Sequence, residues 1–168
     1  KSKLEIERKI DAYFQQGSEF LSLRFFNVYG PEQRLDSNYG AVVPIFIDRY
    51  TQGIQPTIYG SGNQSRDFVN VHDIARLLVD LSIGEWAQPK QSVYNVGTGQ
   101  SVTITELASL IHELSQSNLA FEPSFQTQRA GDIEHSVASI EAIRRDLNWK
   151  PEISLEDGLR ELIEVDSS

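Results

Sequence analysis

Residues 58–74 constrain the fold more than any other stretch of this chain. They read as a short strand, a polar loop with two glycines, a second short strand and the start of a helix. The loop ends in Arg66-Asp67, directly before the apolar pair Phe68-Val69. An arginine at that place can hold a phosphate by two parallel charge-assisted hydrogen bonds, but an ordinary surface Arg–Asp pair contributes almost nothing to stability. The stretch alone leaves both interpretations open and favours the surface pair.

The rest of the chain alternates helical and strand patterns, which predicts an α/β fold. Strands are expected over residues 20–29 (buried), 92–96 and 119–121, with the polar stretch 124–134 irregular. Helices are expected over residues 1–14, 42–50, 73–81, 103–114, 139–147 and 154–163. Thr103 with Glu106 predicts a capping box, and Ser139 and Ser154 are expected to cap the last two helices.

Composition narrows the range of functions. The chain has 168 residues, of which 39% are apolar, enough for one domain with a sizeable core. It has no apolar run near the roughly 20 residues of a membrane span, and its charged first residues do not resemble a signal peptide, so we expect a soluble cytoplasmic protein. A formal charge of −9 argues against a general nucleic-acid binder. The absence of cysteine and the three scattered histidines argue against a metal site.

The sequence lacks the glycine-rich turn of a dinucleotide-binding domain. Gly97-Thr98-Gly99 does not complete a G-x-G-x-x-G motif and fits a turn at the end of a strand better. No N-cap precedes the helical pattern at Lys1, so we expect the chain to begin inside a helix, as if cut there. The organisation resembles the second half of an open-sheet enzyme more than a complete doubly wound domain.

Several short motifs, each weak alone, follow one another in a characteristic order. They are Ser-Lys-Leu at 2–4 with Glu7, Leu-Arg-Phe-Phe-Asn-Val-Tyr-Gly-Pro at 23–31, Tyr-Gly-Ala-Val-Val-Pro at 39–44, Ile-Tyr-Gly at 58–60, Ser-Arg-Asp-Phe-Val at 65–69, Tyr-Asn-Val-Gly-Thr-Gly at 94–99 and Arg-Ala-Gly-Asp at 129–132. With this ordered set the chain resembles, over nearly its whole length, the C-terminal half of an NAD-dependent nucleotide-sugar epimerase or dehydratase of the extended short-chain dehydrogenase/reductase family. The UDP-glucose and UDP-N-acetylglucosamine 4-epimerases are the nearest type.

The resemblance implies the C-terminal part of that family's α/β fold, which is the end of the parallel nucleotide-binding sheet plus a smaller substrate-binding α/β domain. Residues 1–30 are then a remnant of the NAD-binding Rossmann domain, comprising the motif-lysine helix and the strand after it. Residues 31–168 are mainly the domain that binds the nucleotide-sugar, and a return of some of its segments to the Rossmann sheet stays open.

The resemblance also implies the chemistry. Lys3 matches the lysine of the family's Tyr-x-x-x-Lys motif, which binds the nicotinamide ribose of NAD and lowers the pKa of the tyrosine. That tyrosine would lie two positions before Lys1, so the chain alone is expected to be inactive. Phe25 would lie near the nicotinamide. On residues alone, Lys3 reads instead as a solvated lysine at a frayed helix start.

The implied substrate site is polar at its diphosphate end. Arg66 and Arg129 would converge on the diphosphate, and Asp132 would hold either the ribose hydroxyls or an arginine. Asn27 would donate to a diphosphate oxygen, or it simply forms an Asx-turn into the following residues.

The other implied substrate contacts concern the base and the sugar. Ala41 and Val42 would contact the uracil and Tyr59 would cover it, although core packing explains these three nearly as well. Ser136 would lie beside the sugar 2-position, where a small residue leaves room for an acetamido group and a tyrosine does not. Alternatively, Ser136 only begins the turn into the next helix.

The expected activity is 4-epimerisation of a UDP-hexose or UDP-N-acetylhexosamine by transient oxidation at sugar C4 with NAD. A dehydratase or decarboxylase on the same scaffold and a non-catalytic nucleotide-binding relative are the alternatives. The opening helix, with Ile6, Ile10, Tyr13 and Phe14, would either form a homodimer interface or pack on the parallel sheet. We interpret His72 and His135 as structural or surface residues.

Overall fold

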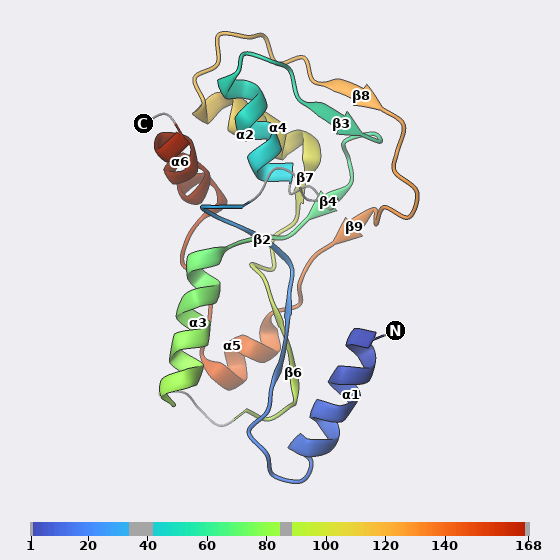
Figure 1. Cartoon of the computed structure of the whole chain (residues 1–168), viewed down its shortest axis with the longest axis vertical. Helices are drawn as coiled ribbons and strands as arrows, with labels where there is room; N and C mark the ends of the chain where they lie inside the picture. Colours follow the sequence, from blue (N-terminus) through green and yellow to red (C-terminus); the bar gives the residue numbers. More distant parts are fainter. Residues whose placement is uncertain (1, 34–41, 85–88, 167–168) are drawn as a thin grey trace.

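The computed structural model describes residues 2–33, 42–84 and 89–166 of the chain (Figure 1). Helices and strands alternate as expected for an α/β fold. In chain order they are α1 (Ser2–Phe14), β1 (Ser22–Phe25), β2 (Asn27–Tyr29), α2 (Val42–Thr51), β3 (Thr57–Tyr59), β4 (Ser65–Arg66), β5 (Phe68–Asn70), α3 (Val71–Ile83), β6 (Val93–Val96), β7 (Val102–Thr103), α4 (Ile104–Leu114), β8 (Ser124–Gln126), β9 (His135–Ser136), α5 (Glu141–Leu147) and α6 (Leu155–Asp166).

Most strand pairs are parallel, as a fold built from strand–helix–strand units requires. β1 pairs with β6, β2 with β5 and β3 with β8, each in parallel, while β4 lies between the antiparallel β7 and the parallel β9. The strands that pair are far apart in sequence, so residues from both halves of the chain meet around β4.

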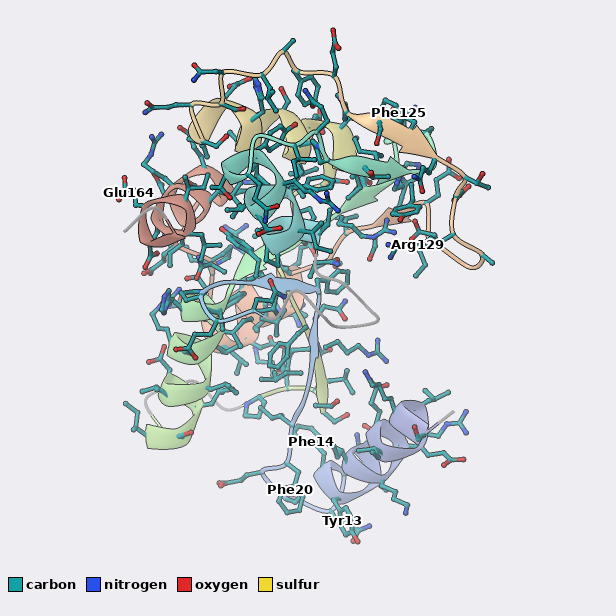
Figure 2. The ribbon with its side chains drawn as sticks, turned by 45° about the horizontal axis from the view of Figure 1, so that its top comes forward. Tyr13, Phe14, Phe20, Phe125, Arg129 and Glu164 are labelled. Atoms are coloured by element: carbon teal, nitrogen blue, oxygen red, sulfur yellow. The ribbon has the colours of Figure 1, made fainter. Side chains whose placement is uncertain are left out.

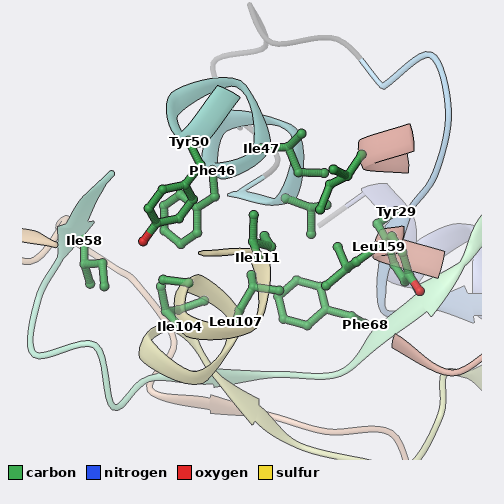
Figure 3. Packing of buried hydrophobic residues seen from close by; sticks show 13 residues of the cluster. Tyr29, Phe46, Ile47, Tyr50, Ile58, Phe68, Ile104, Leu107, Ile111 and Leu159 are labelled. Atoms are coloured by element: carbon green, nitrogen blue, oxygen red, sulfur yellow. The ribbon is translucent and has the colours of Figure 1, made fainter. Parts of the chain in front are cut away.

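The larger hydrophobic core lies between α2, α4 and α6, and we call it the α2–α4–α6 core. Helix α2 buries Val43, Phe46, Ile47 and Tyr50, the spacing that places side chains on one face of a helix. Figure 3 shows these side chains facing those of α4 and α6. The buried members are Tyr29, Val43, Phe46, Ile47, Tyr50, Ile58, Phe68, Ile104, Leu107, Ala108, Ile111, Leu159 and Ile163.

A second core, the α3–α5 core, lies between α3, α5 and β6. Its buried members are Val69, Ile74, Leu77, Tyr94, Val96, Ala138, Ile140, Ile143, Leu147 and Trp149. Phe68 and Val69 are neighbours on β5 and alternate between the two faces of the strand, so one belongs to each core. The chain therefore passes repeatedly from one core to the other (Figure 1).

The prediction of one buried strand over residues 20–29 is wrong. The segment forms two strands, β1 and β2, which are separated at Phe26. β1 is at most half-buried, and Phe25 is 45% exposed. The break has a physical cause, because the chain changes partner there. The Phe26 amide still donates to the Val96 carbonyl at 3.0 Å, whereas the Asn27 amide donates to the Asp67 carbonyl at 3.0 Å.

Three further boundaries differ from the expectations. Helix α3 begins at Val71 rather than Asp73, because the Asn70 side chain caps it by accepting from the His72 amide at 2.8 Å. The strand expected at 119–121 lies instead at β8, inside the stretch expected to be irregular. Ser139 does not cap α5; its hydroxyl donates to the Glu141 carboxylate.

The other helix caps are confirmed. Thr103 and Glu106 form both bonds of a capping box at α4, and the Ser154 hydroxyl accepts from the Asp157 amide at 3.0 Å before α6. No helix in the described part of the chain has the length and apolar character needed to cross a membrane.

Candidate functional site

A cavity of about 520 Å³ lies beside the α2–α4–α6 core. Its apolar wall comes from α2 and β3, and its polar wall comes from β4 and the segment between β8 and β9. The lining residues are Asn27, Val28, Tyr29, Gln33, Val42, Val43, Ile45, Phe46, Thr57, Ile58, Tyr59, Gln64, Arg66, Phe68, Ile104, Arg129, Ala130, Gly131 and Asp132. A cavity that is apolar at one end and cationic at the other suits a ligand with a flat ring joined to an anionic group.

Arg66 is held in place at the polar wall. Its guanidinium donates to the Ser65 carbonyl at 2.8 Å and to the Glu134 carbonyl at 3.4 Å, and it forms an ion pair with the Asp132 carboxylate. The side chains of Arg66 and Asp132 are only 14% and 25% exposed. The ion pair is therefore partly desolvated, unlike the exposed surface pair that the sequence alone favoured, and Arg66 pairs with Asp132 rather than with the adjacent Asp67.

Arg129 provides a second cation at the same wall. Its guanidinium carbon lies 4.3 Å from the centre of the Tyr59 ring, within cation–π range, and the residue is otherwise exposed. The Asp132 amide donates to the Arg129 carbonyl at 3.2 Å, which closes a turn whose third residue, Gly131, has φ of +79°. This turn explains the Arg-Ala-Gly-Asp sequence, because it brings Arg129 and Asp132 to the same cavity.

The adjacent residue Asp67 has a different task. It is completely buried and accepts hydrogen bonds from the Thr98 amide and hydroxyl, the Gly99 amide and the Ala138 amide, at 2.6–3.1 Å. A Cβ at Gly97 would lie 2.7 Å from this carboxylate. Asp67 thus ties the turn after β6, and the chain leading into α5, to the strand beside Arg66. The Gly-Thr-Gly sequence ends a strand, as predicted.

Tyr29 lines the cavity as a protonated phenol. Burial raises the pKa of Tyr29 to about 12, so its hydroxyl stays protonated at neutral pH, and it donates to the Ser154 carbonyl at 3.4 Å. Among the described residues, no group of three or more His, Asp and Glu side chains is placed to hold a metal ion.

The structure brings together most of the predicted substrate residues. Asn27, Val42, Tyr59, Arg66, Arg129 and Asp132 all line the cavity. Ser136 does not; it lies on β9 beside Arg66, in register with it and partly buried. Ala41 lies outside the described residues.

Lys3 and Phe25 lie apart from this cavity. Lys3 is exposed in the first turn of α1, and Phe25 ends β1. Figure 2 shows α1 at the lower end of the molecule, apart from Arg129 on the right of its upper half. Helix α1 is fixed to β1 because Arg24 donates to the Glu7 carboxylate at 2.8 and 2.7 Å, which also lowers the pKa of Glu7.

Sequence reasoning missed two polar lining residues, Gln33 and Gln64. Gln64 donates to the Tyr59 carbonyl at 2.5 Å and so supports the strand that carries the aromatic ring. Gln33 donates to the Val28 carbonyl at 3.1 Å. Neither residue stands out in the sequence, because glutamine is common in polar loops. The available signal was their position, since Gln64 follows the Ile-Tyr-Gly motif and Gln33 follows the end of a predicted strand.

The parallel strands and the cavity define the C-terminal part of the extended short-chain dehydrogenase/reductase fold. The UDP-glucose 4-epimerase of Thermotoga maritima, solved with UDP-glucose, superimposes with a TM-score of 0.86 at 31% identity, covering 98% of this chain and 52% of that one. The UDP-N-acetylglucosamine 4-epimerase of Methanobrevibacter ruminantium, in complex with UDP-N-acetylmuramic acid, gives a TM-score of 0.81 at 33% identity, covering 94% and 51%.

Comparison of sequences agrees. The model of the NAD dependent epimerase/dehydratase family matches residues 1–97, and the chain belongs to this family. A Methanocaldococcus jannaschii protein named "Putative UDP-glucose 4-epimerase" is 35% identical over 148 residues, which cover 88% of this chain and 45% of that protein. The chain thus spans about half the length of the proteins it matches.

Proposed function

We propose that this chain supplies the nucleotide-sugar site of an NAD-dependent 4-epimerase that acts on a UDP-hexose or a UDP-N-acetylhexosamine. The observation that carries the proposal is the cavity with Arg66 and Arg129 on one wall and apolar side chains on the other. The family and the two epimerase structures support it.

Each end of the cavity has a task in this proposal. The guanidiniums of Arg66 and Arg129 bind the diphosphate, and Asn27 donates to one of its oxygens. Tyr59 covers the uracil, while Val42 and the other α2 side chains that line the cavity contact its other side. The sugar then lies toward Ser136, the residue that the resemblance places beside the sugar 2-position.

The redox part of the site belongs to the end of the β1–β6 pair. Ligands of open α/β sheets bind outside the carboxyl ends of parallel strands, and Phe25 stands at that end with 45% of its surface exposed. This exposed ring fits a nicotinamide, and Lys3 would bind the ribose next to it. NAD would supply reversible hydride removal at sugar C4. We accordingly assign β1, β6 and the α3–α5 core to the NAD-binding body.

Calorimetric titration of the chain with UDP and with uridine tests the substrate site. Arg66→Ala or Arg129→Ala should weaken UDP binding by roughly 1.5–3 kcal/mol, the scale of hydrogen bonds to charged groups, and change uridine binding far less. Arg144→Ala, which removes an exposed arginine of α5 away from the cavity, serves as the control. Equal losses for UDP and uridine would show that the two arginines only support the fold.

A dehydratase is the second candidate, since the family unites both activities. The two reactions share substrate binding and the first oxidation, so turnover must separate them. Product analysis of the enzyme that contains this chain distinguishes a 4-epimer from a dehydrated keto-sugar.

A further inference from the structure

The ion pair between Arg66 and Asp132 places a carboxylate where an anionic ligand is expected to bind. Both side chains line the cavity, and both are largely screened from solvent. A carboxylate and a phosphate next to the same guanidinium repel each other, and the repulsion grows as water is excluded. The ligand therefore meets an arginine that already has an anionic partner.

The segment that carries Asp132 is held firmly only at its ends. β8 is paired with β3, and β9 is paired with β4. Between them, residues 127–131 are exposed, and the turn contains Gly131 with open space around it. Over the cavity, this segment contacts the wall through the Asp132–Arg66 pair and the stacking of Arg129 on Tyr59, and near β9 the Glu134 carbonyl accepts from the Ser65 amide at 2.8 Å.

We propose that Asp132 is an internal competitor for Arg66: it occupies the guanidinium until the diphosphate of the ligand takes its place, and a rotation of the turn at Gly131 then moves the Asp132 carboxylate away from β4 while Arg129 stays on Tyr59. This inference rests on the proposed function, because it needs a diphosphate at Arg66. An anion must therefore bind Arg66 more strongly than Asp132 does. This favours a ligand that contacts both Arg66 and Arg129 over a ligand that contacts only one of them.

The test is the binding of inorganic pyrophosphate and of UDP to the chain, measured by calorimetry. Asp132→Asn should bind pyrophosphate roughly five- to tenfold more tightly than the wild type, since the competing charge is gone. The matched control is Glu134→Gln, which removes the same charge from the same segment, where the Glu134 side chain is 80% exposed and does not pair with Arg66. It should change the affinity by less than twofold.

A double-mutant cycle separates direct competition from general repulsion. In an Arg66→Ala background, Asp132→Asn should no longer tighten pyrophosphate binding. If Asp132→Asn binds pyrophosphate no more tightly than Glu134→Gln does, or more weakly than the wild type, Asp132 supports Arg66 and the competition is refuted. A wild-type chain that binds neither pyrophosphate nor UDP would instead refute the proposed function itself.

Discussion

At the scale of the residue, neighbouring side chains have separate tasks. Arg66 faces the cavity, while Asp67 is buried on the other side and holds the turn after β6. The two neighbouring side chains lie on different sides of the chain, so Arg66 lines the cavity and Asp67 stabilises the buried turn. The sequence pair Arg-Asp is thus no ion pair at all, and the arginine takes its partner from residue 132.

Ser136 provides a prediction about the sugar. It is partly buried on β9, beside Arg66 and next to the cavity rather than in its lining. If the sugar extends from the diphosphate toward Ser136, Ser136→Tyr in the enzyme that contains this chain should lower kcat/KM for UDP-N-acetylglucosamine by at least about tenfold, because a phenol ring fills the space of an acetamido group. The value for UDP-glucose should change little. An unchanged ratio of the two values would remove Ser136 from the substrate site.

Glu106 provides a prediction about pH. Hydrogen bonds from the backbone and side chain of Thr103 lower the pKa of Glu106 below its ordinary value of 4.5. A group with a lowered folded pKa stabilises the protein above its unfolded pKa and loses that contribution as the pH falls through the folded pKa. The stability advantage of the wild type over Glu106→Gln should therefore be constant near pH 7 and decline below about pH 4.5.

Urea unfolding of both proteins between pH 7 and pH 3 measures this difference. Glu113→Gln, which removes an exposed carboxylate from the other end of the same helix, controls for general charge effects. A difference between wild type and Glu106→Gln that stays constant down to pH 3 would contradict the prediction.

At the scale of the element, Asp67 should matter most for stability. Asp67→Ala would leave the Thr98, Gly99 and Ala138 amides without their buried acceptor. We expect the free energy of unfolding to fall by about 3 kcal/mol or more, measured in urea, since each unsatisfied buried group costs roughly 1–3 kcal/mol. Asp80→Ala, at a partly exposed position of α3, should cost less than about 0.5 kcal/mol. Similar losses for the two variants would show that the turn is not held by Asp67.

The elements with local signals were predictable from the sequence. Helices α2, α4 and α6 have amphipathic spacing and, for α4 and α6, side-chain caps that act within a few residues. β8 was missed because Ser-Phe-Gln is short and exposed, and it forms through its pairing with β3, 67 residues away in the chain. The break at Phe26 was missed for the same reason, because only the distant strands β5 and β6 decide where the partner changes.

The candidate site divides in the same way. Arg66, Arg129 and Tyr59 were predictable because they belong to motifs, and the cavity brings them together. The Arg66–Asp132 pair was left as one of two alternatives, since no spacing in the sequence shows that a turn at Gly131 points the carboxylate at β4.

At the scale of the whole molecule, binding and chemistry should be separable. The residues that line the cavity belong to this chain. Of the Tyr-x-x-x-Lys motif, by contrast, the sequence contains the lysine, Lys3. We expect the chain alone to bind UDP but to show no turnover of UDP-glucose when NAD is added. A coupled assay for UDP-galactose measures this, with UDP binding as the check that the protein is folded. Turnover by the highly purified chain would contradict the expectation.

The alternation of Phe68 and Val69 between the two cores has a mechanical consequence. Two bodies joined by a single linker can rotate about it as a hinge. Here the chain crosses from one core to the other at β1–β2, β5–α3, β6–β7 and β9–α5. We expect such a joint to resist both bending and torsion, and so to hold the cavity at a constant distance from the carboxyl end of β1. Under the proposed function, a sugar held by its diphosphate in one body would be presented to the other at a constant distance, and only the Asp132 turn would have to move for the ligand to enter and leave.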